Sequence, residues 1–381
     1  MNIVLFFTRS VTLKQWIAQG LFDREKLLYE TFIKQSQSIN IYWITYGRHD
    51  SIIASNLYNQ NSLSRKIHVI SKPPFFPEGK YFDLIYSLLI PFIYFSLLSR
   101  ASLIKSNQLD GSWAGLLSSH IFRKPFILRL GFLPSQVEYA ACSRNKIRFK
   151  LLCLIEKIMA SASPNIITTT SSILNTIHLF SSLGKKNCAI IPNYVNTDLF
   201  SSSRELSFRD EKIVYYGRLS PEKNLFELIE ACHLANIHLD IFGDGPLLNA
   251  LNDYIKKHNY KVTLSPPLPN SELPCLLNKY RYFALVSSTE GMPKTLIESM
   301  SCGVIPIVSP IEPITNILGA DYNFVSSSHS SDSISLAITK AMTCSSQLLS
   351  DNLSQLVKSR YSISSIAKQE LDFYLTVLSR S

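Results

Sequence analysis

Short apolar runs alternate with longer amphipathic stretches along this chain, and this alternation limits the possible folds more than any other feature. The runs have the length of buried strands, and the stretches between them have the length of helices. Strands that alternate with helices form parallel sheets, because each helix carries the chain back to the start of the next strand. We therefore expect an α/β protein with doubly wound parallel sheets.

The pattern continues through both halves of the chain. The apolar runs predict twelve strands at Asn2–Phe7, Asn40–Thr45, Lys66–Ile70, Ser102–Lys105, Pro125–Arg129, Asn165–Thr168, Cys188–Ile191, Lys212–Tyr216, His238–Phe242, Lys261–Leu264, Tyr282–Val286 and Val304–Val308. The longer stretches predict helices near 22–36, 83–98, 112–122, 143–162, 224–235, 246–258, 271–279, 294–302 and 362–379.

A chain of 381 residues is too long for one ordinary core and suits two domains. The Pro- and Asn-containing segment Ile190–Phe200 (IIPNYVNTDLF) reads as the crossing between them. We expect an N-terminal domain over 1–192 and a C-terminal domain over 193–360. The remaining residues, 361–381, are expected to form a helix that could cross back to the N-terminal domain.

The positive charge of the chain is unevenly distributed. The net charge is +10, but residues 1–190 hold 22 Lys and Arg against 9 Asp and Glu, a net charge of +13, and residues 191–381 carry −3. A basic half indicates an anionic partner, either a membrane surface or nucleic acid. Because the sequence has no zinc-finger spacing, no RNP-type aromatic pattern and no basic low-complexity arm, we expect a membrane and no nucleic acid.

Four cations, Arg144, Lys146, Arg148 and Lys150, precede an apolar helix and are the predicted membrane contact. A solvated helix end is the alternative. The apolar run at 82–98 contains Pro91 and favours a buried or interfacial helix over a membrane span. Seven cysteines without a CxxC pair, and no convincing secretion signal, favour a cytoplasmic protein, peripheral on the inner face of the membrane.

The strongest chemical motif is EGMPKTLIE, from Glu290 to Glu298, which follows a predicted strand and enters a predicted helix near Pro293. A helix start with free N–H groups suits a diphosphate. A carboxylate one or two turns into the helix can accept hydrogen bonds from two sugar hydroxyls. An exposed loop Glu and a solvated helix Glu are the alternative, which this strand–loop–helix setting disfavours.

Two further motifs follow strands of the same half. In YGRLSPEK, Gly217 permits a tight exit from the sheet, and Arg218 and Lys223 can converge on a phosphate leaving group. In IFGDGP, Gly243 and Gly245 allow a close backbone approach, but the third glycine of a dinucleotide fingerprint is missing. Two surface cations around a turn remain the simpler interpretation of the first motif alone.

Taken as a set over 190–310, these motifs resemble the C-terminal domain of the retaining GT-B glycosyltransferases of family 4. The resemblance implies two Rossmann-like domains that face a cleft, with a nucleotide-sugar donor held by the C-terminal one. By position, Arg218 and Lys223 match the pair that neutralises the diphosphate, Glu290 the carboxylate at the transferred sugar, and Glu298 the carboxylate at the ribose. The stretch that lines sugar and phosphates matches Gly291, Met292, Lys294 and Thr295.

The N-terminal half departs from the family pattern. The glycine-rich loop after the first strand is replaced by FFTRSVTLKQW, and the family's histidine at the mouth of this sheet is not evident. Arg129, in Arg-Leu-Gly, occupies a comparable place. In the linker, Tyr194 replaces a glycine of the family pattern, with no evident consequence.

The resemblance implies transfer of a hexose-type sugar, with its anomeric configuration retained, to a glycan or lipid-linked acceptor. Surface polysaccharide synthesis in bacteria (O-antigen, capsule or exopolysaccharide) is the expected setting. No cofactor and no metal are expected, because the cations and a helix N-terminus can hold the leaving charge and no Asp-x-Asp occurs. A GT-B-like nucleotide-sugar epimerase and a non-catalytic nucleotide-sugar-binding protein remain alternatives.

Overall fold

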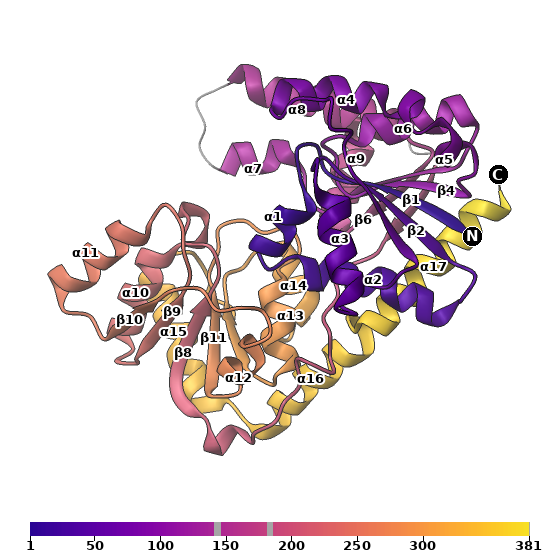
Figure 1. Ribbon diagram of the computed structural model, residues 1–381. Helices are drawn as coiled ribbons and strands as arrows, with labels where there is room; N and C mark the ends of the chain where they lie inside the picture. The colour runs from indigo at the N-terminus through magenta and orange to yellow at the C-terminus, as the bar shows by residue number, and fades with distance from the viewer. Residues whose placement is uncertain (141–145, 181–185, 381) are drawn as a thin grey trace. The chain divides into compact units, whose positions relative to one another are not determined.

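The structure is a computed structural model that describes residues 1–140, 146–180 and 186–380. Contacts between residues divide it into two compact units. The first unit contains Met1–Gln136, residues 146–192 and the end of the chain from Ile366, and the second contains Asn193–Ser365. Each unit is built on its own parallel sheet with helices packed against it (Figure 1).

The first unit has a seven-stranded parallel sheet in the order β3-β2-β1-β4-β5-β6-β7. Its strands are β1 (Asn2–Phe6), β2 (Asn40–Ile44), β3 (Ile67–Ile70), β4 (Leu103–Ser106), β5 (Phe126–Leu130), β6 (Asn165–Thr168) and β7 (Asn187–Ile190). The order reverses between β1 and β4, so the crossovers on the two sides of this point place their helices on opposite faces of the sheet.

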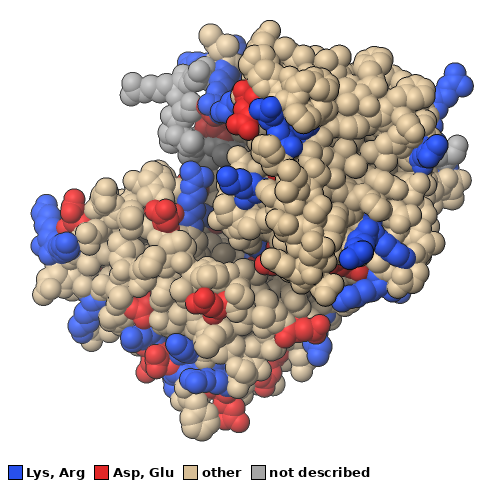
Figure 2. Space-filling view, in the orientation of Figure 1, with Lys and Arg blue, Asp and Glu red and all other residues tan. Residues whose placement is uncertain are grey.

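Helices cover both faces of this sheet (Figure 1). The helices before Pro192 are α1 (Leu13–Ala18), α2 (Phe22–Gln35), α3 (Asp50–Asn59), α4 (Lys80–Ile93), α5 (Phe95–Ser99), α6 (Ser112–Phe122), α7 (Pro134–Ala140), α8 (Lys146–Ala162) and α9 (Ser171–Phe180), and α17 (Ile363–Ser379) is the last helix of the chain. α6 contacts both α4 and α8 on one face. The surface over α4 and α6 shows few charged side chains (Figure 2).

α17 is fastened to the first unit by a buried charge cluster. Glu370 on α17 is fully buried; it accepts from Lys105 of β4 and, at 3.1 Å, from Arg129 of β5. Burial alone would raise the pKa of Glu370, but the two cations outweigh burial and hold this pKa below its ordinary value. Tyr374 donates to the same carboxylate, and its ring packs edge-on against Phe32 of α2 with centroids 5.6 Å apart.

The second unit has a five-stranded parallel sheet in the order β10-β9-β8-β11-β12. Its strands are β8 (Asp210–Tyr216), β9 (Leu239–Phe242), β10 (Val262–Ser265), β11 (Tyr280–Leu285) and β12 (Ile305–Val308). Its helices are α10 (Leu225–Leu234), α11 (Leu248–His258), α12 (Leu273–Leu277), α13 (Lys294–Ser301), α14 (Glu312–Leu318), α15 (Ser331–Cys344) and α16 (Gln347–Arg360), with short 3-10 turns η1 (Leu206–Phe208) and η2 (Pro221–Lys223).

All twelve predicted strands are confirmed to within two residues at each end, and so is the parallel, doubly wound α/β class. The single helix predicted at 83–98 is wrong, because Tyr94 leaves helical geometry and separates α4 from α5. Pro91 weakens the last turn of α4, since it has no N–H to donate. Helices α1, α3, α7, α9, α14 and α16 were not specified by the pattern. No helix among the described residues is long and apolar enough to span a membrane.

Candidate functional site

Two loops of the second unit lie side by side where its strand order reverses. β8 and β11 are neighbours in the sheet, but the chain continues from β8 to β9 on one side and from β11 to β12 on the other. Open parallel sheets bind ligands at such a switch point, outside the carboxyl ends of the strands. The loop after β8 (217–224) and the loop after β11 (286–293), which carry the main motifs, are both at this edge.

Lys223 and Glu290 are brought together across these two loops. The Lys223 Nζ lies 2.5 Å from Glu290 Oε1, and Ser287 donates to the same oxygen at 2.7 Å. Both charged side chains are largely buried, with exposed fractions of 18% and 12%. Ser288 N donates to the carbonyl of Glu222 at 2.9 Å and fastens one loop to the other. A cation and a carboxylate that are partly withdrawn from water interact strongly with a polar ligand placed between the loops.

The structure places Arg218 differently. Its side chain is exposed, and no hydrogen bond or ion pair of its guanidinium is recorded with the described residues. Its carbonyl accepts from Tyr215 at 2.8 Å, so the backbone is fixed and the side chain extends from the start of the same loop. Lys223 and Glu290 therefore meet in this structure, and Arg218 does not join them.

The glycines of the two motifs allow the loops to pack backbone against backbone. A Cβ on Gly243 would lie 2.1 Å from the carbonyl oxygen of Gly217, and one on Gly245 would lie 2.4 Å from that of Leu219. Leu219 N also donates to the Asp244 carbonyl at 2.9 Å. The close approach expected at Gly243 is thus made by the neighbouring loop, and it shapes the edge of the site.

α13 starts directly after the loop that carries Glu290 and Gly291. Its N-cap, Pro293, contributes no side-chain cap, so this helix end is suited to an anion. Glu298 lies on α13 and is 4% exposed. Tyr216, the last residue of β8, donates to the carbonyl of Thr295 at 2.8 Å and lies 3.3 Å from Glu298 Oε2. Sequence reasoning missed Tyr216, although it directly precedes Gly217 in the quoted motif.

The segment that leads into the second unit packs on the same loop. Asn193 donates through Nδ2 to the carbonyl of Met292 at 2.9 Å, and its N–H lies 2.9 Å from the Met292 sulfur. The Lys294 Nζ lies 5.7 Å from the ring centroid of Tyr194, a cation–π distance. Tyr194, to which the sequence assigned no consequence, therefore helps to fix Lys294 at the start of α13.

The first unit carries a polar cluster at its own switch point. Arg9, after β1, forms a two-bond pair with Asp110, after β4, with distances of 2.9 and 3.2 Å, and its guanidinium lies 5.7 Å from the Trp113 ring. Nearby in the sequence, Ser10 Oγ and the Tyr46 hydroxyl are buried with no recorded hydrogen-bond partner among the described residues. Burial raises the pKa of Tyr46, so its hydroxyl stays neutral and able to donate.

Arg129 does not take part in this cluster. The sequence placed it at the mouth of the N-terminal sheet, but its guanidinium is buried against Glu370. The expectation was wrong because the carboxylate that attracts Arg129 comes from α17, more than 200 residues further along the chain. The polar residues at this edge are Arg9 and Asp110.

The predicted membrane contact is described in part. Arg144 lies outside the described residues, whereas Lys146, Arg148 and Lys150 are exposed on the first turns of α8. In the described ranges, no group of three His, Cys, Asp or Glu side chains is placed to hold a metal ion.

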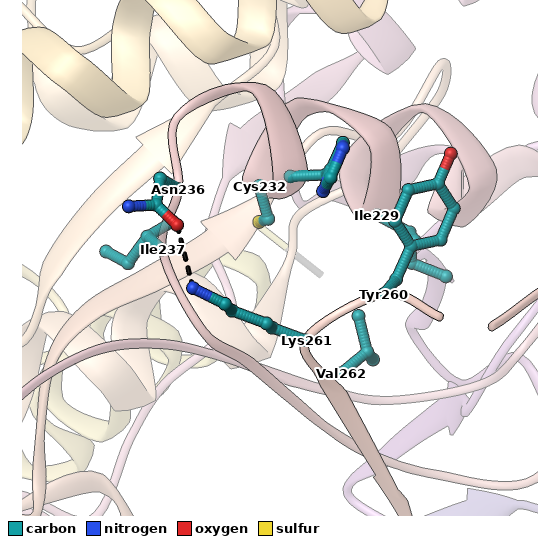
Figure 3. A pocket seen from close by; sticks show the side chains of 8 residues that line it. Ile229, Cys232, Asn236, Ile237, Tyr260, Lys261 and Val262 are labelled. Atoms are coloured by element: carbon teal, nitrogen blue, oxygen red, sulfur yellow. Dashed lines mark hydrogen bonds between the residues drawn. The ribbon is translucent and has the colours of Figure 1, made fainter. Parts of the chain in front are cut away.

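A small cavity in the second unit is no substitute for the site at the loops. It lies at the opposite, amino edge of the sheet, between the end of α10 and the start of β10, and the Lys261 Nζ donates to Asn236 Oδ1 beside it at 2.8 Å (Figure 3). Its volume of about 10 Å³ admits one water molecule at most.

Residues 200–359 match the family model described as Glycosyl transferases group 1. Over 219 residues the chain is 26% identical to a phosphatidylinositol N-acetylglucosaminyltransferase of Arabidopsis thaliana, covering 55% of this chain and 48% of the relative. Over 141 residues it is 32% identical to the UDP-Gal:alpha-D-GlcNAc-diphosphoundecaprenol alpha-1,3-galactosyltransferase of Escherichia coli, covering 32% and 36%. The chain thus spans about half or less of the curated relatives it matches.

A solved structure extends the likeness to the whole chain. Anabaena HepE in complex with UDP superposes with a TM-score of 0.73, covering 99% of this chain and 100% of that one. At 15% identity this likeness shows the fold alone. Through residues 200–359 this chain belongs to the Glycosyl transferases group 1 family, on a GT-B fold.

Proposed function

We propose that this protein is a retaining glycosyltransferase that moves a hexose-type sugar from a nucleotide-diphosphate sugar to a glycan or lipid-linked acceptor. The observation that carries the proposal is the pair of Lys223 and Glu290, brought together from two loops at the switch point of the second unit. The start of α13 lies next to this pair in the sequence and supplies a site for anionic phosphates. Curated relatives with matching segments are named as glycosyltransferases.

In the proposed reaction, the bond between the sugar's anomeric carbon and the diphosphate breaks, and the diphosphate leaves with the electron pair. Lys223, Arg218 and the amides at the start of α13 stabilise the negative charge that develops on it. Glu290 binds hydroxyls of the transferred sugar. Glu298, held near Tyr216, accepts from the ribose hydroxyls of the nucleotide. The acceptor hydroxyl forms the new bond to the anomeric carbon and releases its proton.

Gly217, Gly243, Gly291, Met292, Lys294 and Thr295 complete the proposed donor site. The two glycines Gly217 and Gly243 set the loop geometry, because a side chain on Gly243 would collide with the Gly217 carbonyl. Lys294 lies at the start of α13, where its charge adds to that of the helix dipole. No metal is assigned to the leaving group, since cations and backbone dipoles suffice for this role.

The acceptor belongs with the first unit in this proposal. The Asp110 side chain is 43% exposed while it is paired with Arg9, so it can accept from a sugar hydroxyl without losing its counter-charge. The setting we propose is bacterial surface polysaccharide synthesis. The Escherichia coli relative supports this, since its name specifies a diphosphoundecaprenol-linked acceptor.

A membrane contact of the first unit is the second part of the proposal. Lys146, Arg148 and Lys150 are exposed at one end of α8, and residues 1–190 carry a net charge of +13. Each such cation near an anionic surface contributes about 1 kcal/mol to binding. The protein would then be peripheral on the inner face of the cell membrane, where lipid-linked acceptors are presented.

The test is a panel of UDP-, GDP- and TDP-sugars, screened by thermal shift and then by hydrolysis and transfer. Stabilisation by one nucleotide class, followed by slow hydrolysis that Lys223→Ala removes, is the expected outcome. Lys256→Ala, at an exposed position of α11, is the matched control and should leave both signals unchanged. Turnover of the nucleotide sugar to its epimer without an acceptor would favour the epimerase. Binding without any turnover would favour the non-catalytic alternative.

A further inference from the structure

α8 presents an apolar stripe to solvent. Ile147 is 82% exposed, and Leu151, Leu154 and Ile158 are each more than half exposed. Their spacing of four, three and four residues places them along one side of the helix. The acidic residue within α8, Glu156, is turned inward and accepts two bonds from Ser135, so this side of α8 carries no carboxylate.

The neighbouring helices extend this stripe into a face. α6 contacts both α8 and α4, and both neighbours carry exposed apolar side chains. Phe95, after α4, packs against Phe122 at the end of α6, with ring centroids 5.1 Å apart. We call this the apolar face; its exposed residues are Leu88, Phe92, Phe95, Leu117, Ile121, Ile147, Leu151, Leu154 and Ile158. The near absence of charge is visible over α4 and α6 in Figure 2. An exposed apolar face on this scale marks a binding surface.

A basic pocket lies where the stripes of α6 and α8 end. The cavity has a volume of about 470 Å³ and is lined by Ser119, His120, Arg123, Lys124, Pro125, Phe126, Ala162 and Pro164. Ala162 is one turn beyond Ile158 on α8, and His120 is the neighbour of Ile121 on α6. The lining contains two permanent cations, a histidine and no acidic residue.

Arg123 occupies a position that its backbone disfavours. It caps the end of α6 in the left-handed conformation, with φ 52° and ψ 47°, where glycine or asparagine is the usual residue. Neither Arg123 nor Lys124 has a recorded side-chain ion pair with a described residue. Both cations are therefore available to an anion in the pocket.

The charges bracket the apolar face. Lys146, Arg148 and Lys150 lie at the start of α8, and the basic pocket lies at its other end, about 25 Å away for a helix of 17 residues. Cations at both ends of an apolar face complement an anionic monolayer, in which phosphates lie above the acyl chains. A face that bound another protein through apolar contacts alone would not need both basic ends.

We propose that the apolar face inserts into an anionic phospholipid monolayer and that the pocket of His120, Arg123 and Lys124 binds the phosphate of one lipid headgroup. This inference rests on the membrane contact proposed above, but it changes its nature. The contact suggested by the charge cluster is electrostatic and is screened by salt, whereas insertion of apolar side chains resists salt. It does not depend on the donor site.

The experiment is co-sedimentation of the full chain with vesicles of phosphatidylglycerol and phosphatidylcholine, or of phosphatidylcholine alone, at low and high salt. Wild type should stay bound to the anionic vesicles at high salt. Leu154→Gln with Ile158→Gln should bind at low salt and lose on the order of tenfold or more of its affinity at high salt. Leu336→Gln with Leu348→Gln changes equally exposed leucines of the second unit and should behave as wild type.

The pocket has its own variant. Arg123→Asn with Lys124→Gln removes both cations while asparagine suits the left-handed position, so the thermal unfolding temperature should not fall. This variant should lose most of the preference for anionic over neutral vesicles. A preference that stays at the wild-type level overturns the headgroup pocket. Equal stabilisation of wild type by inorganic phosphate and by anionic vesicles, lost in this variant, assigns the pocket to free phosphate and overturns the lipid.

The remaining outcomes separate this inference from the proposed membrane contact. If wild type binds no vesicle at low salt, both fail. If wild type binds but salt releases it completely, and Leu154→Gln with Ile158→Gln binds equally well, the electrostatic contact stands and insertion is overturned. If light scattering shows a dimer that this double variant dissociates, with no vesicle binding, the face belongs to a second copy of the chain and the inference is overturned.

Discussion

Glu370→Gln removes the negative charge that Lys105 and Arg129 share inside the first unit. The carboxylate is fully buried, and the side chains of the two cations are 1% and 11% exposed. Glutamine has nearly the same shape, so no cavity forms and the change isolates the charge. Two buried cations are then left without a counter-charge, which is the situation that makes breaking a buried ion pair costly.

The expected loss is about 3–5 kcal/mol of unfolding free energy, the range for removing one partner of a buried pair. In a unit of roughly 200 residues each kcal/mol lowers the unfolding temperature by about 2–4 °C. The transition of the first unit should therefore fall by about 6–20 °C. Because α17 joins this unit through Glu370, the same change should increase hydrogen exchange in the helix from Ile366 onward.

The assay is differential scanning calorimetry, with two variants for comparison. Lys105→Met leaves Arg129 and Glu370 as a balanced pair and should cost less than half as much. Asp372→Asn changes an exposed carboxylate two residues away on the same helix and should stay within about 0.5 kcal/mol of wild type. A Glu370→Gln transition within about 2 °C of wild type, or an equal loss in Lys105→Met, would refute the charge argument.

Three further outcomes are expected. Lys223→Ala should reduce turnover at least tenfold with little change in unfolding temperature, because its charge acts mainly on the leaving diphosphate; a near-normal kcat in steady-state assays would contradict the assignment. Transfer should persist in excess EDTA, and activity lost to the chelator and restored by Mg²⁺ or Mn²⁺ would show that the metal-free mechanism is wrong. Burial lowers the pKa of Lys105 to about 8, below that of an unfolded lysine, so the unfolded chain holds more protons between pH 8 and 10 and stability should rise with pH there. Calorimetry across this window should show the rise in wild type and a smaller one in Lys105→Met.

The strands could be predicted because both faces of a parallel sheet are buried. Such strands appear as continuous apolar runs, which stand out against polar loops. The missed helices have no such signal. α3 and α9 are rich in Ser and Asn, residues with modest helix propensity, and their helical form depends on packing against the sheet.

The motifs identified the residues of the candidate site, but not their contacts. Lys223 and Glu290 are 67 residues apart, and they meet because β8 and β11 are neighbours in the sheet. Strand order is a property of the whole sheet and is not written in any local pattern. The same holds for Gly243, whose space is filled by the Gly217 carbonyl of the next loop.

By itself, the sequence determined the fold class, the positions of the strands and the family of the second unit, because local periodicity and short motifs carry this information. Only the tertiary structure decided which charges meet. It turned Arg129 inward to Glu370, paired Arg9 with Asp110, and left the apolar side chains of α6 and α8 in solvent beside a basic pocket. Burial and ion pairing depend on distances between segments that are remote in sequence, and those distances exist only once the sheets have formed.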